Sequence, residues 1–274
     1  MSGILYVTGT PIGNLSDLSP RAAQTLESVD FIAAEDTRVT LKLLNHLGIK
    51  KPMVSYFEHN KRERGEIICG RIESGENCAI VTDAGMPCIS DPGEDLIKLC
   101  EERGIKTVVI PGPSAVISAL AVSGLETGRF CFEGFLSVNK KSRSEHLQSL
   151  QNERRTMIFY EAPHKLPSTL RDLYSAFGDR KLSIVRELTK IHEEVIRTTT
   201  SYAAENYSDG SIKGEIVLVL EGKKSEDTPE EYTLEYAVEL AKRLVEGGEK
   251  ATEAAKQAAA MTGFKKNEIY KELL

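Results

Sequence analysis

The chain has 274 residues and a formal net charge of −6, with 41% hydrophobic and 28% charged residues. This length predicts two domains with room for a small third element, and the ordinary apolar content excludes an intrinsically disordered chain. A mildly acidic balance does not indicate general nucleic-acid binding, so a polyanionic partner would have to meet a local basic patch. No signal peptide and no apolar run long enough to span a membrane are recognisable, so no membrane partner is expected.

The cysteines are odd in number and show neither a CxxC pair nor a Cys/His spacing typical of structural zinc. We therefore expect free thiols in a reducing compartment and a cytoplasmic protein. The five positions are Cys69, Cys78, Cys88, Cys100 and Cys131.

Short apolar runs alternate with helical segments through the first half of the chain. Strands are expected at residues 4–7, 31–34, 53–56, 79–81 and 106–110. Helices are expected from Ser19-Pro20 to Val29, from 41 to 47 before Gly48, over 62–73 and over 93–103. This alternation predicts a first α/β domain, residues 1–123, with a mainly parallel sheet covered on both faces.

The rhythm continues after a linker predicted at residues 123–128. Expected strands are 130–133, 157–160, 182–186, 195–200 and 215–220, and expected helices are 144–151, 166–177 and 202–207. We predict a second α/β domain, residues 124–222, with more antiparallel pairing.

The remaining residues, 223–274, are predicted to be a polar linker and a small helical bundle. A capping-box pattern at 228–231 precedes an apolar stripe from Leu234 to Val245, and two shorter helices are expected at 251–261 and 265–273. Contact with nucleic acid and a packing or dimerisation role are equally good explanations of this bundle.

Three of the expected strands are followed by loops rich in Gly, Pro, Asp and Ser, at residues 8–14, 82–93 and 111–115. Ligands of open α/β sheets bind at the carboxyl ends of strands, so these loops predict a cleft. The GxxxxGK[ST] and GxGxxG patterns are absent, and Pro11 stands where a pyrophosphate needs bare backbone. S-adenosylmethionine, held by backbone and apolar contacts, suits such loops better than a nucleoside triphosphate or NAD.

Seven motifs occur in order: GTPIGNLSD, AEDTR, TDAGMPCISDPG, PGPSA, FYEAPHK, RELTK and GEIVLVLEG. Over about residues 4–222 the chain thereby resembles the tetrapyrrole methylase superfamily, and within it the branch that methylates ribosomal RNA of the small subunit. The resemblance implies two α/β domains of tetrapyrrole-methylase type with a cleft between them and a C-terminal helical element. It implies transfer of a methyl group from S-adenosylmethionine to the ribose 2′-oxygen of a cytidine in 16S ribosomal RNA.

The resemblance also implies where the cofactor lies. A carboxylate near the sulfonium would stabilise its charge, and Asp83, Glu161 and Glu215 are candidates, although Asp83 can equally serve as a loop cap. The helix expected to open at Ser114 offers free N–H groups to the methionyl carboxylate. The predicted cofactor-binding residues are Pro11, Asp83, Ala84, Gly85, Ile89, Gly112, Ser114, Ala115, Tyr160, Glu161 and Glu215.

Methyl transfer to a hydroxyl benefits from a base or from a cation beside the developing alkoxide. Candidates that follow apolar strands are Arg38, Glu187 and Lys190. Lys190 could stabilise the alkoxide or act as base, Glu187 is the alternative base, and Arg38 suits a phosphate. Ion pairs such as Glu35–Arg38 or Glu187–Lys190 explain the same residues equally well, and the chemistry needs no metal.

RNA binding requires cations, and the best basic segment is Lys140, Lys141 and Arg143, in a loop expected after residues 135–136. The expected partner is small-subunit ribosomal RNA or the assembled small subunit, and the resemblance implies a homodimer. Two other functions stay open at this point: methylation of a small tetrapyrrole precursor, and a non-enzymatic module that binds the ribosome or nucleic acid.

Overall fold

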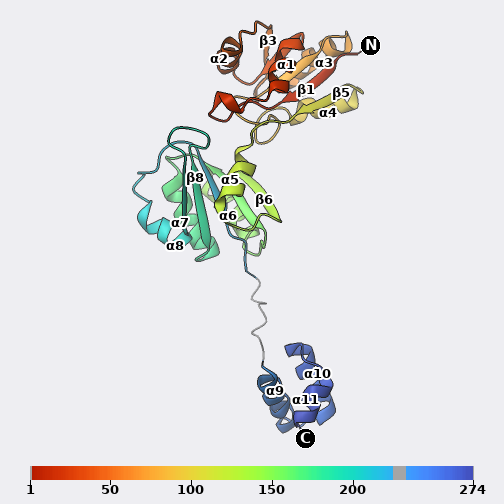
Figure 1. The fold of residues 1–274 in the computed structure, drawn as a ribbon, viewed down its shortest axis with the longest axis vertical. Helices are drawn as coiled ribbons and strands as arrows, with labels where there is room; N and C mark the ends of the chain where they lie inside the picture. Colours follow the sequence, from red (N-terminus) through yellow and green to blue (C-terminus); the bar gives the residue numbers. More distant parts are fainter. Residues whose placement is uncertain (1, 225–232, 274) are drawn as a thin grey trace. The chain divides into compact units, whose positions relative to one another are not determined.

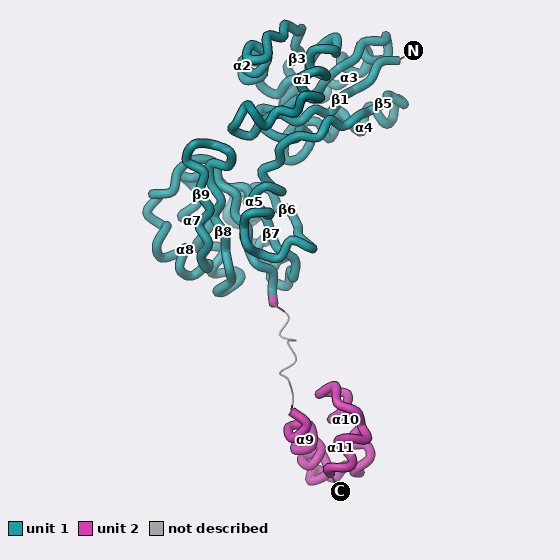
Figure 2. The backbone as a smooth tube through the Cα atoms, in the orientation of Figure 1, with its two compact units in different colours: residues 1–223 teal, residues 224–274 magenta. Residues whose placement is uncertain are grey.

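The computed structural model describes residues 2–224 and 233–273. The chain forms two compact units, residues 1–223 and residues 224–274 (Figure 2). The first unit carries two five-stranded sheets and the second carries three helices (Figure 1). The α/β fold class expected from the sequence is confirmed. The capping box expected at residues 228–231 lies outside the described residues.

The first sheet has the strand order β3-β2-β4-β1-β5, and every neighbouring pair is parallel, as predicted. Its strands are β1 (Ile4–Thr8), β2 (Phe31–Ala34), β3 (Met53–Ser55), β4 (Cys78–Val81) and β5 (Lys106–Ile110). Its helices are α1 (Pro20–Ser28), α2 (Thr37–Leu47), α3 (Lys61–Glu73) and α4 (Glu94–Glu102).

The central strands of this sheet are buried on both faces. In β2, Phe31 and Ala33 belong to a core shared with α3 and α4, whereas Ile32 and Ala34 belong to a core shared with α1 and α2. Successive side chains of a strand point to opposite faces, so an unbroken apolar run requires helices on both sides. This packing leaves the carboxyl ends of the strands free to carry the ligand-binding loops.

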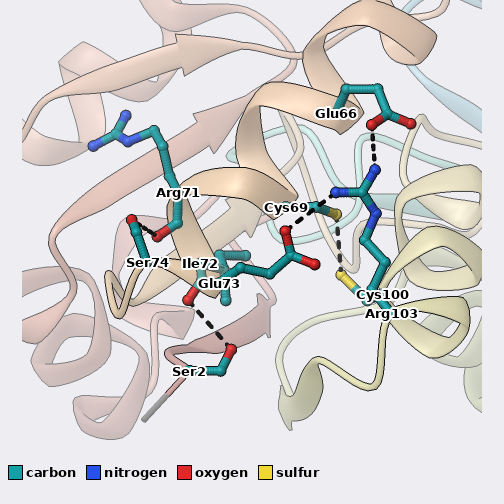
Figure 3. A network of polar contacts seen from close by, with 9 residues as sticks. All are labelled: Ser2, Glu66, Cys69, Arg71, Ile72, Glu73, Ser74, Cys100 and Arg103. Carbon is teal, nitrogen blue, oxygen red and sulfur yellow. Dashed lines mark hydrogen bonds and ion pairs between the residues drawn. The ribbon is translucent and has the colours of Figure 1, made fainter.

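Polar and sulfur contacts fix α3 against its neighbours (Figure 3). The Sγ atoms of Cys69 on α3 and Cys100 on α4 lie 3.8 Å apart in the core, and all five cysteines of the chain are free thiols. Arg103, at the end of α4, pairs with Glu66 and, at 3.3 Å, with Glu73 on α3. These contacts connect α3 and α4, which together cover one face of the sheet.

The second sheet has the order β6-β7-β10-β8-β9. Only β6 and β7 run parallel, and the other neighbouring pairs are antiparallel, so the predicted mixture is confirmed. The strands are β6 (Phe130–Phe135), β7 (Thr156–Glu161), β8 (Lys181–Arg186), β9 (Glu194–Thr199) and β10 (Ile216–Leu220). Helices α6 (Lys140–Ser149), α7 (Leu166–Phe177) and α8 (Thr200–Asn206) supply the core on one face.

Helix α5 (Ala115–Ser123) covers the other face of the second sheet (Figure 1). Val116 and Leu120 of α5 share a core with Val185 of β8 and Val217 of β10. The predicted boundary at residue 123 groups α5 with the first domain, whereas its packing groups it with the second. Ile12, from the loop after β1, enters the same core and ties the two halves of this unit together.

The segment Lys140–Arg143 is not a loop, so that expectation is wrong. It forms the first turn of α6, which begins four residues before the predicted start. Asn139 caps the helix by accepting hydrogen bonds from the backbone N–H groups of Lys141 (3.0 Å) and Ser142 (3.2 Å). An Asn at this position satisfies donors that a helix start would otherwise leave unpaired.

The second unit consists of α9 (Leu234–Glu246), α10 (Ala251–Thr262) and α11 (Lys266–Leu273). Alanines dominate their shared core, with Val238 and Ile269 as the larger buried side chains. Small residues let the three helices pack closely. Within the described residues, none of the helices has the length and apolar character needed to cross a membrane.

Candidate active site

A cavity of about 380 Å³ lies between the two α/β halves of the first unit. Its walls come from the loop after β4, the start of α5, the end of β7 and the start of β10. Eight of the predicted cofactor-binding residues line it and come from four separate motifs: Ala84, Gly85, Ile89, Ser114, Ala115, Tyr160, Glu161 and Glu215.

The loop after β4 is shaped by unusual backbone angles. Cys88 and Ser90 have positive φ values of 70° and 63°, a conformation that non-glycine residues rarely adopt. Backbone hydrogen bonds hold the loop to the loop after β1, from Thr10 N to Gly85 O (2.9 Å) and from Gly85 N to Thr10 O (3.2 Å). Strained residues held by their surroundings are typical of binding loops.

Aromatic rings form one wall of the cavity. Tyr160 meets Phe132 at 4.9 Å between ring centroids and Phe135 at 5.4 Å. Phe135 lines the cavity and is 58% exposed, so an apolar ring face is open to a planar ligand. Phe135 was not among the residues predicted from the sequence, although an aromatic residue at the end of a strand could have indicated it.

Three carboxylates line the cavity, those of Asp91, Glu161 and Glu215. Glu161 is 5% exposed and accepts from Ala162 N–H (2.8 Å) and from the Thr169 hydroxyl (2.5 Å), so its orientation is fixed. Burial, with the charge of Glu35 nearby, raises the pKa of Asp91 to about 6. These carboxyl groups therefore lie beside a space whose other walls are mostly apolar.

The start of α5 supplies hydrogen-bond donors. Ser114 is the N-cap residue of α5, but its side chain makes no capping hydrogen bond. The first N–H groups of a helix have no partner within the helix and carry the positive end of its dipole. Since Ser114 and Ala115 line the cavity, these donors border a space that suits an anionic group.

A second cavity, of about 300 Å³, adjoins the first and shares Ile12, Ala84 and Glu215 with it. Pro11 and Asp83, predicted to bind the cofactor, line this second cavity instead of the first. Gly112 lines neither cavity and packs against Gly9 of the loop after β1. The motif pattern alone did not show which loop residues line which cavity, because this depends on the turns of each loop.

Lys190 lines the second cavity and joins two carboxylates. Its Nζ lies 2.9 Å from Glu187 Oε1 and 2.9 Å from Glu215 Oε2, so the expected Glu187–Lys190 ion pair is present. Partial burial opposes the charge of Lys190, but its hydrogen bonds to Glu215 and Glu187 outweigh this and raise its pKa. The backbone N–H of Glu215 and the Lys190 ammonium lower the pKa of Glu187. Lys190 is therefore a cation fixed by two carboxylates, and Glu187, with its lowered pKa, is a weak base.

Arg38 stands apart from this cluster. Its side chain is 87% exposed and pairs with Asp36 at 2.6 Å, so the expected pairing with Glu35 is wrong. Hydrogen bonds from Arg38 lower the pKa of Asp36 to about 2. Glu35 instead accepts a hydrogen bond from the Thr82 hydroxyl (2.5 Å). Arg38 Nε and Nη2 donate to Asp36, and the rest of the exposed guanidinium faces solvent.

The basic residues of α6 differ in availability. Lys141 is exposed and lies 3.9 Å from Glu145, and Lys140 is exposed. Arg143 is only 17% exposed and pairs with Asp172 of α7 at 2.8 Å. The structure thus leaves the two lysines open to an anion and uses Arg143 to dock α6 on α7.

Comparison with known proteins identifies the family. Residues 4–204 match the family model "Tetrapyrrole (Corrin/Porphyrin) Methylases". The chain belongs to the tetrapyrrole methylases. Within this family, it is 45% identical over 269 residues to a ribosomal RNA small subunit methyltransferase I from Synechocystis sp., covering 98% of this chain and 96% of that protein.

A second relative and a solved structure are also similar to this chain. A ribosomal RNA small subunit methyltransferase I from Thermotoga maritima is 48% identical over 222 residues, covering 81% of this chain and 100% of that protein. The solved uroporphyrin-III C-methyl transferase from Thermus thermophilus, complexed with S-adenyl homocysteine, aligns with a TM-score of 0.57 at 15% identity, covering 80% of this chain and 97% of that chain. That structural likeness concerns the fold alone.

Proposed function

We propose that this protein transfers the methyl group of S-adenosylmethionine to the ribose 2′-oxygen of a cytidine in small-subunit ribosomal RNA. The observation that carries the proposal is near-full-length identity of 45% to a methyltransferase named for that RNA. The two adjoining cavities support it, because methyl transfer needs a donor and an acceptor held side by side.

The first cavity fits S-adenosylmethionine in size and chemistry. Its volume of about 380 Å³ lies in the range of small-molecule sites, and its walls are mainly apolar. Phe135 and Ile89 offer apolar surface to an adenine ring, and the uncapped start of α5 offers N–H groups to the methionyl carboxylate. Bound there, S-adenosylmethionine supplies an electrophilic methyl group on a positively charged sulfur.

Charged residues complete the proposed cofactor site. Two hydrogen bonds hold the carboxyl group of Glu161 in place at the cavity wall, so it does not need to reorganise when a ligand binds. Glu215 lines both cavities and is anchored by Lys190. Pro11, Asp83 and Gly112 belong to the loops that shape the neighbouring space, so we no longer assign them direct contact with the cofactor.

The second cavity is the proposed acceptor site. Lys190 is held there as an ammonium group by Glu187 and Glu215, which suits stabilisation of a ribose oxygen as its negative charge develops. Glu187 then serves as the positioning residue for Lys190. The raised pKa of Lys190 disfavours its alternative role as a base.

RNA would be held outside the cavities. Arg38 follows β2 at the end of the sheet, and the N–H groups of its exposed guanidinium that do not bond Asp36 can donate to a phosphate. Lys140 and Lys141 provide a second phosphate contact at the start of α6. These contacts would give affinity that falls with salt.

A tetrapyrrole acceptor and a non-enzymatic role are not favoured. The named relatives of high identity are ribosomal RNA methyltransferases, and the likeness to a tetrapyrrole-modifying enzyme rests on 15% identity. A purely binding module would leave the built cavity between the two sheets without a purpose.

The test is methyl transfer from radiolabelled S-adenosylmethionine to assembled small subunits, to naked small-subunit RNA and to a porphyrin precursor. We expect label in 2′-O-methylcytidine after digestion of RNA to nucleosides. Label only in the porphyrin, or in no acceptor at all, would overturn the proposal.

We further propose a cytoplasmic homodimer. A ribosomal substrate places the enzyme in the cytoplasm. Strand β5 is an edge of the first sheet, and Val109 on it is exposed, as is Ile117 on α5. Apolar residues on an unpaired edge favour association with another chain. Sedimentation should give twice the mass of the chain, and a monomer at micromolar concentration would contradict this.

A further inference from the structure

The second cavity contains one carboxylate with an unusual setting, Asp83. It follows Thr82, the residue after β4, and directly precedes Ala84, which lines both cavities. Its side chain lies in the second cavity with Lys190, one contributed by the first α/β half and the other by the second. The carboxylate of Asp83 therefore borders the second cavity, next to the proposed cofactor cavity.

The surroundings of Asp83 keep its carboxyl basic. Oδ1 accepts a hydrogen bond from Asp36 N–H (3.2 Å), and in the part of the chain that the structure describes no cation lies within ion-pair distance of it. Partial burial and the charge of Glu35 raise its pKa above the ordinary value, whereas the hydrogen bond from Asp36 N–H and the charge of Arg38 oppose this rise. The charged groups around it are Glu35, Asp36, Arg38, Asp91, Lys42, Lys190 and Glu215.

The other carboxylates near the two cavities are either engaged by partners or, like Asp91, line the first cavity and not the second. Glu187 has a lowered pKa because Glu215 N–H and Lys190 stabilise its charge. Glu215 is paired with Lys190 at 2.9 Å. Both carboxylate oxygens of Glu161 accept hydrogen bonds, from Ala162 N–H and from the Thr169 hydroxyl. Asp83 and Glu215 are the carboxylates that line the second cavity, and among the described residues only Asp83 of these two has no cation within ion-pair distance.

We infer that Asp83 is a catalytic residue: its carboxylate is the general base that removes the proton from the ribose 2′-hydroxyl in the second cavity. This inference rests on the proposed function and reassigns Asp83 from cofactor binding to the acceptor side. Lys190, across the same cavity, stabilises the oxygen as it loses its proton. Base and cation thus approach one hydroxyl from opposite halves of the unit.

The step balances without another reactant. The 2′-oxygen forms a bond to the methyl carbon as the carbon–sulfur bond breaks, and that electron pair stays on sulfur, which becomes a neutral thioether. The hydroxyl proton passes to Asp83, whose exposed position lets it return the proton to water. A base whose pKa is raised toward the working pH gains most from such a transfer.

The experiment compares wild type with Asp83→Asn and with the control Asp95→Asn, on α4 and outside both cavities. Asn keeps the size of Asp83 and can still accept from Asp36 N–H. We expect Asp83→Asn to lower kcat on small subunits by about 10²- to 10⁴-fold. The calorimetric Kd for S-adenosylmethionine and the melting temperature should stay at wild-type values.

The pH profile separates a base from a structural role. A base works only when ionised, so log kcat of wild type should rise with pH to a plateau, and Asp83→Asn should lose that plateau and keep rising as hydroxide replaces the carboxylate. An unchanged kcat, a loss of cofactor affinity that matches the loss of activity, or a wild-type pH profile in the variant would each overturn the inference. Failure of the wild type itself to methylate RNA would instead remove the proposed function, and this inference with it.

Discussion

Gly9, in the loop after β1, and Gly112, in the loop after β5, touch backbone to backbone. A Cβ built on Gly9 would lie 2.7 Å from Gly112 Cα, and one built on Gly112 would lie 2.8 Å from Gly9 Cα. No ordinary side chain fits at either position, so both motifs need glycine for close approach. This contact brings two of the three loops into one rigid frame beside the cavities.

Gly9→Ala or Gly112→Ala should therefore separate the two loops. We expect a loss of stability of about 1–3 kcal/mol, typical of overpacking, and weaker binding of S-adenosylmethionine. Gly128→Ala is the matched control, because no atom lies within 4 Å of a Cβ at that position. Denaturant unfolding and calorimetry measure both effects. Wild-type stability and affinity in Gly9→Ala would show that the loops do not need this contact.

Lys190→Gln should lower kcat with little change in the Kd for S-adenosylmethionine. The substitution removes the cation proposed to stabilise the acceptor oxygen, and loss of one such donor costs about 10²- to 10³-fold. Lys190→Arg should retain more activity, because it keeps a charge near Glu187 and Glu215. Lys98→Gln, on the surface of α4, is the control. If Lys190→Gln turned over at the wild-type rate, Lys190 would have no part in the chemistry.

Asp91 should make stability depend on pH. Its pKa is about 6 in the folded protein against 3.8 for the free side chain, so the folded state holds its proton more tightly. Between pH 4 and pH 6 the unfolded state binds fewer protons, and the unfolding free energy must fall as pH rises through this window. Allowing for partial exposure, the wild type should lose roughly 1–2 kcal/mol relative to Asp91→Asn.

Denaturant unfolding of both proteins at pH 4 and pH 7 measures this difference, because shifts of other groups cancel in the comparison. Parallel stability curves for the two proteins would mean that Asp91 ionises normally in the folded state.

Charge reversal on α6 should separate RNA contact from packing. Lys140→Glu with Lys141→Glu should weaken RNA binding and reduce the slope of log K against log salt by about one for each lost phosphate contact. Arg143→Glu should instead destabilise the fold, because it replaces the partner of Asp172 with a like charge. Binding measured at several salt concentrations, with melting temperatures, distinguishes them. A double variant with the wild-type salt slope would remove these lysines from the RNA interface.

The sequence predicted the sheets better than the site. Apolar runs such as 31–34 and 79–81 coincide with β2 and β4, because a strand buried on both faces leaves an unbroken apolar signal. The start of α6 was missed, since an Asn cap after Phe135-Leu136 is a local signal that a run of charges obscured. The sequence did not predict which sheet α5 packs against. Most residues of α5 are apolar, so no single face stands out, and the packing partner is decided by tertiary contacts.

The motifs located the loops, but not the direction of each side chain. Ala84 and Asp83 are neighbours, yet Ala84 lines both cavities and Asp83 only the second. The positive φ values of Cys88 and Ser90 turn the same loop in ways that composition does not encode. Phe135 was overlooked because no charge or motif marked it, and only its exposure at the cavity reveals its position.

A crystal structure with S-adenosylmethionine or its demethylated product would show where the cofactor binds. We expect the ligand in the cavity between the sheets, with its adenine near Phe135 and its carboxylate at the start of α5. The methyl-bearing sulfur should face the second cavity, toward Lys190 and Asp83. A ligand bound elsewhere on the chain, or an empty cavity at saturating ligand, would contradict this placement.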